Sequence, residues 1–111
     1  FNGNDQRVAD IYCEMAPEGF EIAYASSKIS DEEKISLLQG VEYVILHPGV
    51  ISGKILKEAK SLKLIQSLTA GYDKIDMVAA KELNIPVATN GGANSWSVAE
   101  HSIALLLTLY K

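Results

Sequence analysis

The sequence predicts an α/β fold, in which an open parallel sheet carries helices on both of its faces. Short apolar segments alternate with helical patterns along the chain, the order that parallel strands and right-handed crossover helices produce. Residues 43–46 (Tyr-Val-Ile-Leu) form an unbroken apolar run, as in strands covered on both sides, and His47-Pro48-Gly49 end it sharply. We therefore expect one layered domain with four visible strands.

The first third of the chain is predicted to hold two helices and one strand. After a turn cluster at 2–5, apolar residues recur at helical spacing until Pro17 and Gly19, at Val8, Ile11, Tyr12 and Met15. Alternating apolar residues predict a strand over 20–25. Ser30 and Glu33 have the spacing of a capping box, and Gly40 provides a left-handed stop, so a short helix is expected between them.

Two further strands and two helices are expected after residue 43. A modest helix is predicted over 52–61 and a strand over 64–68. The next helix runs from Asp76, its expected N-cap, to Leu83, and Asn84 can adopt the left-handed conformation that ends it. A short strand at 86–89 tolerates Pro86 in its first position.

The last predicted element is a long helix that begins near Ser97. It is apolar around most of its circumference, so we expect it to be buried from several sides and to lead toward a further domain beyond Lys111. The first helix would normally follow a strand, which predicts that a first strand is missing upstream. The expected division is a domain over 1–93 and a connecting helix over 94–111.

Composition excludes several classes of partner. The 111 residues have a formal net charge of −4 with scattered lysines and arginines, which argues against binding to nucleic acid or to an anionic membrane. The longest apolar run, Ile103 to Tyr110, is far shorter than the about 20 residues that a membrane-spanning helix needs. The single cysteine, Cys13, cannot form an intrachain disulfide, which is compatible with a cytoplasmic location.

Ligands of open parallel sheets bind beyond the carboxyl ends of the strands, and the loops after the last two predicted strands are the most suggestive. In the first, 69–73, Gly71 permits a positive φ and carries no obstructing side chain. The amides of Ala70 and Gly71 can then point together as a nest for an anion such as a carboxylate. The alternative is that Gly71 only lets the chain turn from strand to helix.

In the second loop, 90–97, Asn94 offers a neutral donor and acceptor beside the positive end of the following helix. A polar substrate or cofactor edge can be oriented there. The alternative is that Asn94 or Ser97 only caps the helix, since Ser97 and Glu100 are also spaced as a capping box.

Other polar residues have structural explanations. Asp76 is better explained as an N-cap and Asp73 as a loop-closing residue than as a catalytic acid pair. Glu100 and His101 are adjacent on a helix and project about 100° apart, so they cannot form a dyad. His47 is interpreted as a strand-end residue. No glycine-rich dinucleotide or phosphate motif, metal-ligand spacing or nucleophile elbow occurs in the sequence, so no catalytic residue and no metal site is assigned to this chain.

The stretch 62–111 nevertheless resembles the D-isomer-specific 2-hydroxy-acid dehydrogenases, in particular those similar to phosphoglycerate and glycerate dehydrogenases. The resemblance rests on Leu-Lys-Leu-Ile at 62–65, Ala-Gly-Tyr-Asp-Lys-Ile-Asp at 70–76, Ala-Ala at 79–80, Asn-Ile-Pro-Val at 84–87 and Asn-Ser-Trp-Ser-Val-Ala-Glu-His at 94–101. Residues 20–61 share the order of helices and strands with that family, but few identical residues.

The resemblance implies a flavodoxin-like substrate-binding domain that works with a Rossmann domain outside this sequence. By position, Ala70 and Gly71 would bind the substrate carboxylate, Asn94 would touch the substrate, and Val98 would approach the nicotinamide ring. Arg, Glu and His residues of the Rossmann domain would complete the site, so this stretch alone is expected to be inactive. The implied cofactor is NAD or NADP, the substrate a 2-hydroxy or 2-keto acid, and the assembly a homodimer formed through the other domain.

Two non-enzymatic interpretations compete with this one. A free-standing flavodoxin-like or receiver-type signalling domain would need an acidic residue at the end of its central strand, where this sequence has Leu46-His47-Pro48. The other is a structural or interaction domain that has the same fold but no catalytic activity. The sequence beyond Lys111 would distinguish such a domain from an enzyme.

Overall fold

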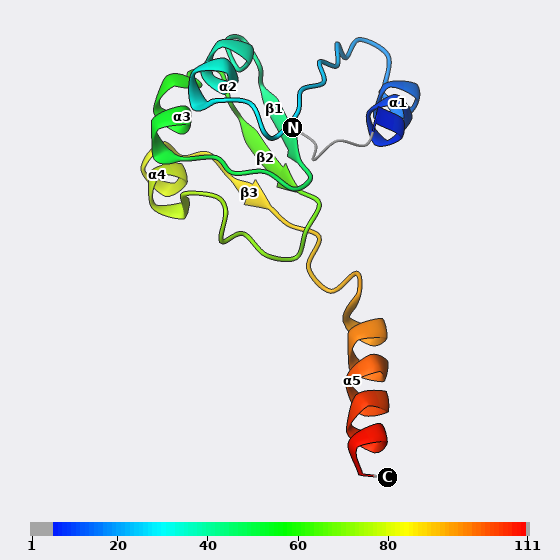
Figure 1. The fold of residues 1–111 in the computed structure, drawn as a ribbon. Coiled ribbons are helices and arrows are strands. Elements are labelled where there is room, and N and C mark those ends of the chain that lie inside the picture. Colours follow the sequence, from blue (N-terminus) through cyan, green and yellow to red (C-terminus); the bar gives the residue numbers. More distant parts are fainter. Residues whose placement is uncertain (1–5, 111) are drawn as a thin grey trace.

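The computed structural model describes residues 6–110, so the predicted turn cluster at 2–5 lies outside the described residues. Eight elements follow one another, namely α1 (Gln6–Met15), α2 (Asp31–Leu37), β1 (Tyr43–Leu46), α3 (Gly53–Glu58), β2 (Leu64–Ser67), α4 (Met77–Glu82), β3 (Val87–Ala88) and α5 (Ser95–Leu109). Figure 1 shows them along the chain. Apart from the segment 20–25, each predicted helix and strand is present, with ends displaced by a few residues.

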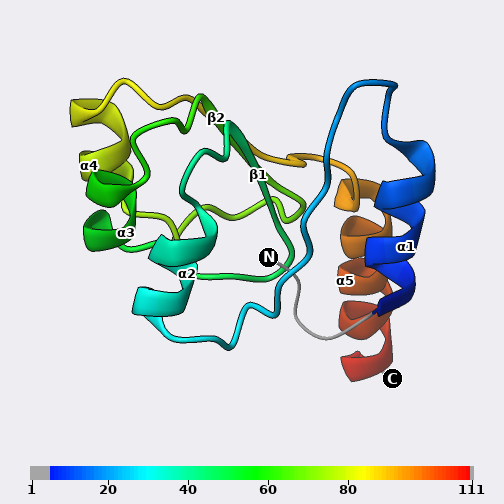
Figure 2. The same ribbon diagram turned by 90° about the horizontal axis from the view of Figure 1, so that it is seen from above.

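The strands form one parallel sheet in the order β1-β2-β3, which confirms the predicted α/β open sheet. Tyr43 is in register with Leu64, and Ile65 with Val87. Helices α2, α3 and α4 gather on one side of the sheet, and α1 lies on the other (Figures 1 and 2). All three carboxyl ends therefore point to the same edge of the sheet.

Local capping signals predict the helix ends correctly. The Ser30 hydroxyl accepts from the Glu33 amide at 3.2 Å, and the Glu33 carboxylate accepts from the Ser30 amide at 2.9 Å, which is the predicted capping box of α2. Asp76 accepts from the Ala79 amide at 3.0 Å and caps α4. Gly40, with φ of 79°, and Asn84, with φ of 55°, adopt the left-handed conformations expected after α2 and α4.

A single apolar core lies between the sheet and helices α3 and α4. Its four largest fully buried side chains are Ile51, Ile55, Leu56 and Ile65. Along β1, burial alternates, with Val44 and Leu46 facing the core while Tyr43 and Ile45 stay partly exposed. The core thus fixes the orientation of β1 and β2, whose ends carry the candidate site.

The strand predicted over 20–25 is not formed, so the described sheet has three strands instead of four. Phe20, Ile22 and Tyr24 remain 58%, 41% and 40% exposed. A strand requires backbone hydrogen bonds to a neighbour along its length, and alternation of apolar residues does not supply them. The segment instead runs past β1, where the rings of Phe20 and Tyr43 lie 6.2 Å apart.

Helix α5 projects from the sheet and is not covered (Figure 1). No residue of α5 is buried, and Trp96 and Leu109 are 85% and 82% exposed, so the burial expected from its sequence does not occur within the described chain. The radius of gyration is accordingly 16.9 Å, against about 13 Å for a compact chain of this length. None of the helices in residues 6–110 has the length and apolarity that a membrane crossing requires.

The start of α5 also differs from expectation. The helix begins at Ser95 with Asn94 as its N-cap residue, which places Ser97 inside the first turn. The predicted capping box of Ser97 and Glu100 is therefore wrong, because the same spacing recurs within helices and caps nothing there. Asn94 makes no side-chain capping hydrogen bond, which leaves its amide group available.

Candidate functional site

The candidate site is a pocket of about 250 Å³ at the carboxyl ends of β1 and β2. It lies between the loop after β1 and the loop after β2, and its lining residues are Leu46, Pro48, Gly49, Ser67, Thr69, Gly71, Asp73, Lys74 and Ile75. This volume is slightly below the about 300 Å³ at which pockets for drug-sized ligands begin. A small organic acid is the size of ligand that fits.

A chain of hydroxyl groups holds the loop after β2. The Thr69 hydroxyl donates to the Gly71 carbonyl oxygen at 3.0 Å and lies 2.9 Å from the Ser67 hydroxyl, which in turn accepts from the Thr69 amide at 3.3 Å. Because the only hydroxyl proton of Thr69 points to Gly71, the Ser67 hydroxyl must be the donor to Thr69. Ser67 is buried, so the chain anchors the loop to the end of β2.

This arrangement engages the Gly71 carbonyl group and leaves the amides of Ala70 and Gly71 without an acceptor within residues 6–110. Both residues are exposed, and Gly71 lines the pocket, whereas Ala70 does not. Unpaired amides beside a pocket are donors that a carboxylate can satisfy. The anion-binding nest at Ala70 and Gly71 stays a prediction, which these two unpaired amides support.

The expected role of positive φ at Gly71 is wrong, because the left-handed glycines of the described chain are Gly19, Gly40 and Gly92. Gly71 matters for space instead. A Cβ atom there would lie 2.8 Å from the Asp73 carboxylate oxygen. Because Gly71 has no side chain, the Asp73 carboxylate can lie close to it. This contact depends on the space between two residues, so the backbone preference of glycine does not predict it.

The loop after β3 is tied to the site through its backbone. The Asn90 amide donates to the Thr69 carbonyl oxygen at 3.1 Å, so the two loops named in the sequence analysis are neighbours. Asn94 and Val98, however, do not line the pocket. Val98 is 55% exposed on α5, and its amide donates to the Asn94 carbonyl oxygen at 3.0 Å in the first turn. Of the four predicted site residues, Gly71 lines the pocket, and Ala70, Asn94 and Val98 do not.

Comparison with known proteins decides the family. The profile of the D-isomer specific 2-hydroxyacid dehydrogenase catalytic domain matches residues 5–104. The chain belongs to this family. Membership sets aside the receiver-type signalling domain, and it places the chain among proteins that use NAD(P).

Similar members of the 2-hydroxyacid dehydrogenase family are much longer than this chain. A D-3-phosphoglycerate dehydrogenase of Dictyostelium discoideum is 32% identical over 93 residues, which cover 83% of this chain and 23% of that protein. A structure from Pyrococcus horikoshii has a TM-score of 0.74 at 26% identity and is covered to 30%, against 95% of this chain. An acyclic imino acid reductase in complex with NADPH and D-Arg has a TM-score of 0.67 at 25% identity, with 91% of this chain and 31% of that one covered.

The sequence-based predictions missed one of the two walls of the pocket, the one formed by the loop after β1. They favoured the loops after β2 and β3, whereas the pocket lies between the loops after β1 and β2 and includes Pro48, Gly49 and Lys74. The missing signal was the strand order, because β1 is the neighbour of β2 on one side as β3 is on the other. The sequence pattern of His47-Pro48-Gly49 indicates only the end of a strand.

Charged groups elsewhere in this dehydrogenase domain serve its fold. The pKa of Glu32 is lowered by a hydrogen bond from Lys54, and the pKa of Lys63 is raised by its hydrogen bond to Glu42, both in exposed pairs outside the pocket. The Nδ1 atom of His47 is buried without a hydrogen-bond partner, but His47 does not line the pocket. No group of three metal-ligating side chains occurs in the part of the chain that the structure describes.

Proposed function

We propose that the pocket holds the carboxylate of a 2-hydroxy or 2-keto acid for an NAD(P)-dependent dehydrogenase reaction. The supporting observation is that the amides of Ala70 and Gly71 have no acceptor within residues 6–110, and that Gly71 lines a pocket of about 250 Å³ at the carboxyl edge of the sheet. Hydrogen bonds to a charged acceptor are stronger than those between neutral groups, so two such amides can fix the orientation of a small acid. The hydroxyl chain through Thr69 keeps them in place before the ligand arrives.

The contribution of this chain to the reaction is binding and orientation. With the carboxylate held at 70–71, the adjacent carbon atom, which carries the hydroxyl or keto oxygen, points out of the pocket toward solvent. When bound, the nicotinamide of NAD(P) would supply or accept the hydride at that carbon. An Arg and a His with its acidic partner, all from a dinucleotide-binding unit, would clamp the carboxylate and exchange the hydroxyl proton.

We further propose that 1–93 is the substrate-binding domain and that 94–111 connects it to the dinucleotide-binding unit. The match covers 23% of the Dictyostelium relative and 30% of the Pyrococcus structure, and the uncovered apolar surface of α5 is what a second unit would bury. Closure of that unit would bring Asn94 and Val98 toward the substrate and the nicotinamide. Gly92, with φ of 84°, lies in the loop that such a closure would bend.

A titration followed by NMR tests the carboxylate site directly. Pyruvate added to the ¹⁵N-labelled chain is expected to move the amide signals of Ala70 and Gly71 saturably, because both N–H groups gain an acceptor. Pyruvamide, which has the same shape and no carboxylate, is the matched control ligand and should leave them in place. Equal shifts with both ligands, or none with pyruvate, would favour a domain that keeps the fold without the chemistry.

A further inference from the structure

One lysine of α2 is buried although the helix is otherwise solvated at its charged positions. Lys34 is 5% exposed, whereas Glu32 and Glu33 on the same helix are exposed. An ammonium group is costly to remove from water unless polar groups replace its hydration. The partners of Lys34 therefore indicate why it is buried.

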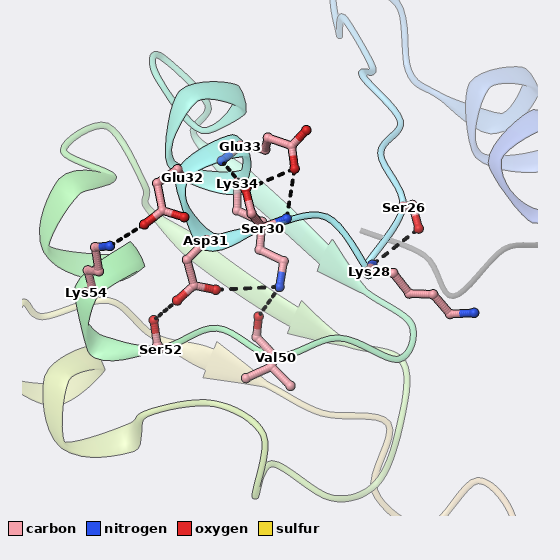
Figure 3. A network of polar contacts seen from close by, with 10 residues as sticks. All are labelled: Ser26, Lys28, Ser30, Asp31, Glu32, Glu33, Lys34, Val50, Ser52 and Lys54. Atoms are coloured by element: carbon pink, nitrogen blue, oxygen red, sulfur yellow. Dashed lines mark hydrogen bonds and ion pairs between the residues drawn. The ribbon is translucent and has the colours of Figure 1, made fainter.

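Those partners belong to α2 itself and to the segment after β1, as Figure 3 shows. The Lys34 ammonium donates to the Val50 carbonyl oxygen at 3.3 Å and lies 4.0 Å from the Asp31 carboxylate. The second oxygen of Asp31 accepts from the Ser52 hydroxyl at 3.0 Å. Two side chains, one turn apart on α2, thus hold Val50 and Ser52.

The segment held in this way joins the two walls of the pocket. Val50 directly follows Pro48 and Gly49, which line one wall. Ile51 then pairs with the opposite wall, since its amide donates to the Lys74 carbonyl oxygen at 3.0 Å and its carbonyl oxygen accepts from the Asp76 amide at 3.1 Å. Lys74 and Ile75 line that second wall.

We propose that Lys34, together with Asp31, is a positioning residue that fixes segment 50–52 and so sets how the two pocket walls face each other. Neither side chain lines the pocket, so the effect is transmitted through the Val50 carbonyl group and the Ser52 hydroxyl. The consequence for ligand affinity rests on the proposed carboxylate site. The effect on segment 50–52 does not depend on any ligand.

The substitution Lys34→Met separates positioning from general stability. Methionine keeps the apolar stem of the side chain and removes the ammonium group. Asp31 remains partly exposed and keeps its bond to Ser52, so no isolated buried charge is left. Lys54→Met is the matched control, because it removes an exposed ion pair to Glu32 that likewise bridges α2 and α3. Ser52→Ala tests the second contact, and its hydroxyl makes no capping bond to α3.

Amide hydrogen exchange without ligand is the first measurement. In Lys34→Met, exchange at Ile51 and Asp76 should rise about tenfold relative to the core amide of Ile65, as expected when a local opening loses one hydrogen bond to a charged group. Ser52→Ala should act in the same direction, and Lys54→Met should match the wild type. Unchanged exchange at Ile51 and Asp76, or an equal rise at Ile65, would overturn the proposal.

Pyruvate affinity in the same variants is the second measurement. It should fall several-fold in Lys34→Met and stay unchanged in Lys54→Met. If the wild type binds no pyruvate, the carboxylate site is refuted, while the exchange result still decides whether Lys34 positions the segment. If the wild type binds and Lys34→Met binds equally well, the positioning role is refuted and the carboxylate site stands.

Discussion

The Thr69 hydroxyl donates to the carbonyl oxygen of Gly71, two residues further along the chain, at 3.0 Å. This bond engages the Gly71 carbonyl group within the loop after β2, while the amides of Ala70 and Gly71 have no acceptor within residues 6–110. Ser67 at the end of the strand supports Thr69 from the other side. The order of the candidate site therefore depends on a side chain that sequence reasoning did not select.

Removal of the Thr69 hydroxyl should make the amides of Ala70 and Gly71 more mobile. Thr69→Val keeps the shape and loses both hydroxyl hydrogen bonds, which should lower the free energy of unfolding by about 1–2 kcal/mol. Pyruvate affinity should fall in parallel, measured by the NMR titration. Thr108→Val, which removes a hydroxyl bond to Ala104 on exposed α5, is the control and should leave affinity unchanged. Equal affinities in wild type and Thr69→Val would mean that the hydroxyl does not order the amides.

A side chain at Gly71 should obstruct the site. In Gly71→Val the new Cβ atom would start 2.8 Å from the Asp73 carboxylate oxygen, so the Asp73 side chain must move and the valine narrows the pocket mouth. We expect at least about a tenfold loss of pyruvate affinity, equivalent to about 1.4 kcal/mol. Gly91→Val is the matched control, since its Cβ atom would meet only Thr89 at 3.7 Å. Retained affinity in Gly71→Val would remove the amides from the mechanism.

The capping box of α2 should make part of the stability depend on pH. The Ser30 amide, followed by the Ser30 hydroxyl, lowers the pKa of Glu33 below its ordinary value of 4.5. Glu33 therefore stabilises the fold above pH 4.5, and this contribution is lost as the pH falls through the lower pKa of the folded state.

Thermal unfolding at several pH values checks this contribution. The difference in Tm between wild type and Glu33→Gln should be largest near neutral pH and shrink in acid. Glu82→Gln on α4, where the carboxylate has no hydrogen bond within residues 6–110, should show no such trend. A Tm difference for Glu33→Gln that is constant with pH would contradict the assignment.

Helix α5 should be weakly protected when the chain is alone. None of its 15 residues is buried within residues 6–110, and isolated helices of about this length are marginal in water. The amide of Leu106 should therefore exchange much faster than that of Ile65 in the sheet core. Protection of Leu106 equal to that of Ile65 would show instead that another surface covers the helix in solution, and dilution would reveal whether that surface is a second copy.

The chain alone should bind no NAD tightly and show no dehydrogenase activity. No glycine-rich dinucleotide motif is present in its sequence, and the catalytic Arg, Glu and His are expected elsewhere. Calorimetry with NAD and NADP, beside an absorbance assay with pyruvate and NADH, measures both. Tight binding or turnover would place a cofactor site within these 111 residues.

Most of the fold could be predicted because its signals are local. The Ser30–Glu33 box, the Asp76 cap and the left-handed stop at Asn84 act between residues a few positions apart, so their physics is complete within a short stretch of sequence. Strands β1 and β2 could also be predicted, from their apolar residues and from the turns that end them. The family could also be recognised, from the sequence motifs within 62–111.

What required the tertiary structure was every feature that depends on a neighbour distant in sequence. Within residues 6–110, the segment 20–25 alternates like a strand but has no strand partner, and α5 has the composition of a buried helix but no buried residue. The pocket uses Pro48 and Lys74 because β1 lies beside β2, and Lys34 is buried because Val50 folds back onto α2. Pairing, burial and cavities are set by packing across the chain, whereas caps and turns are set by the residues within one turn of them.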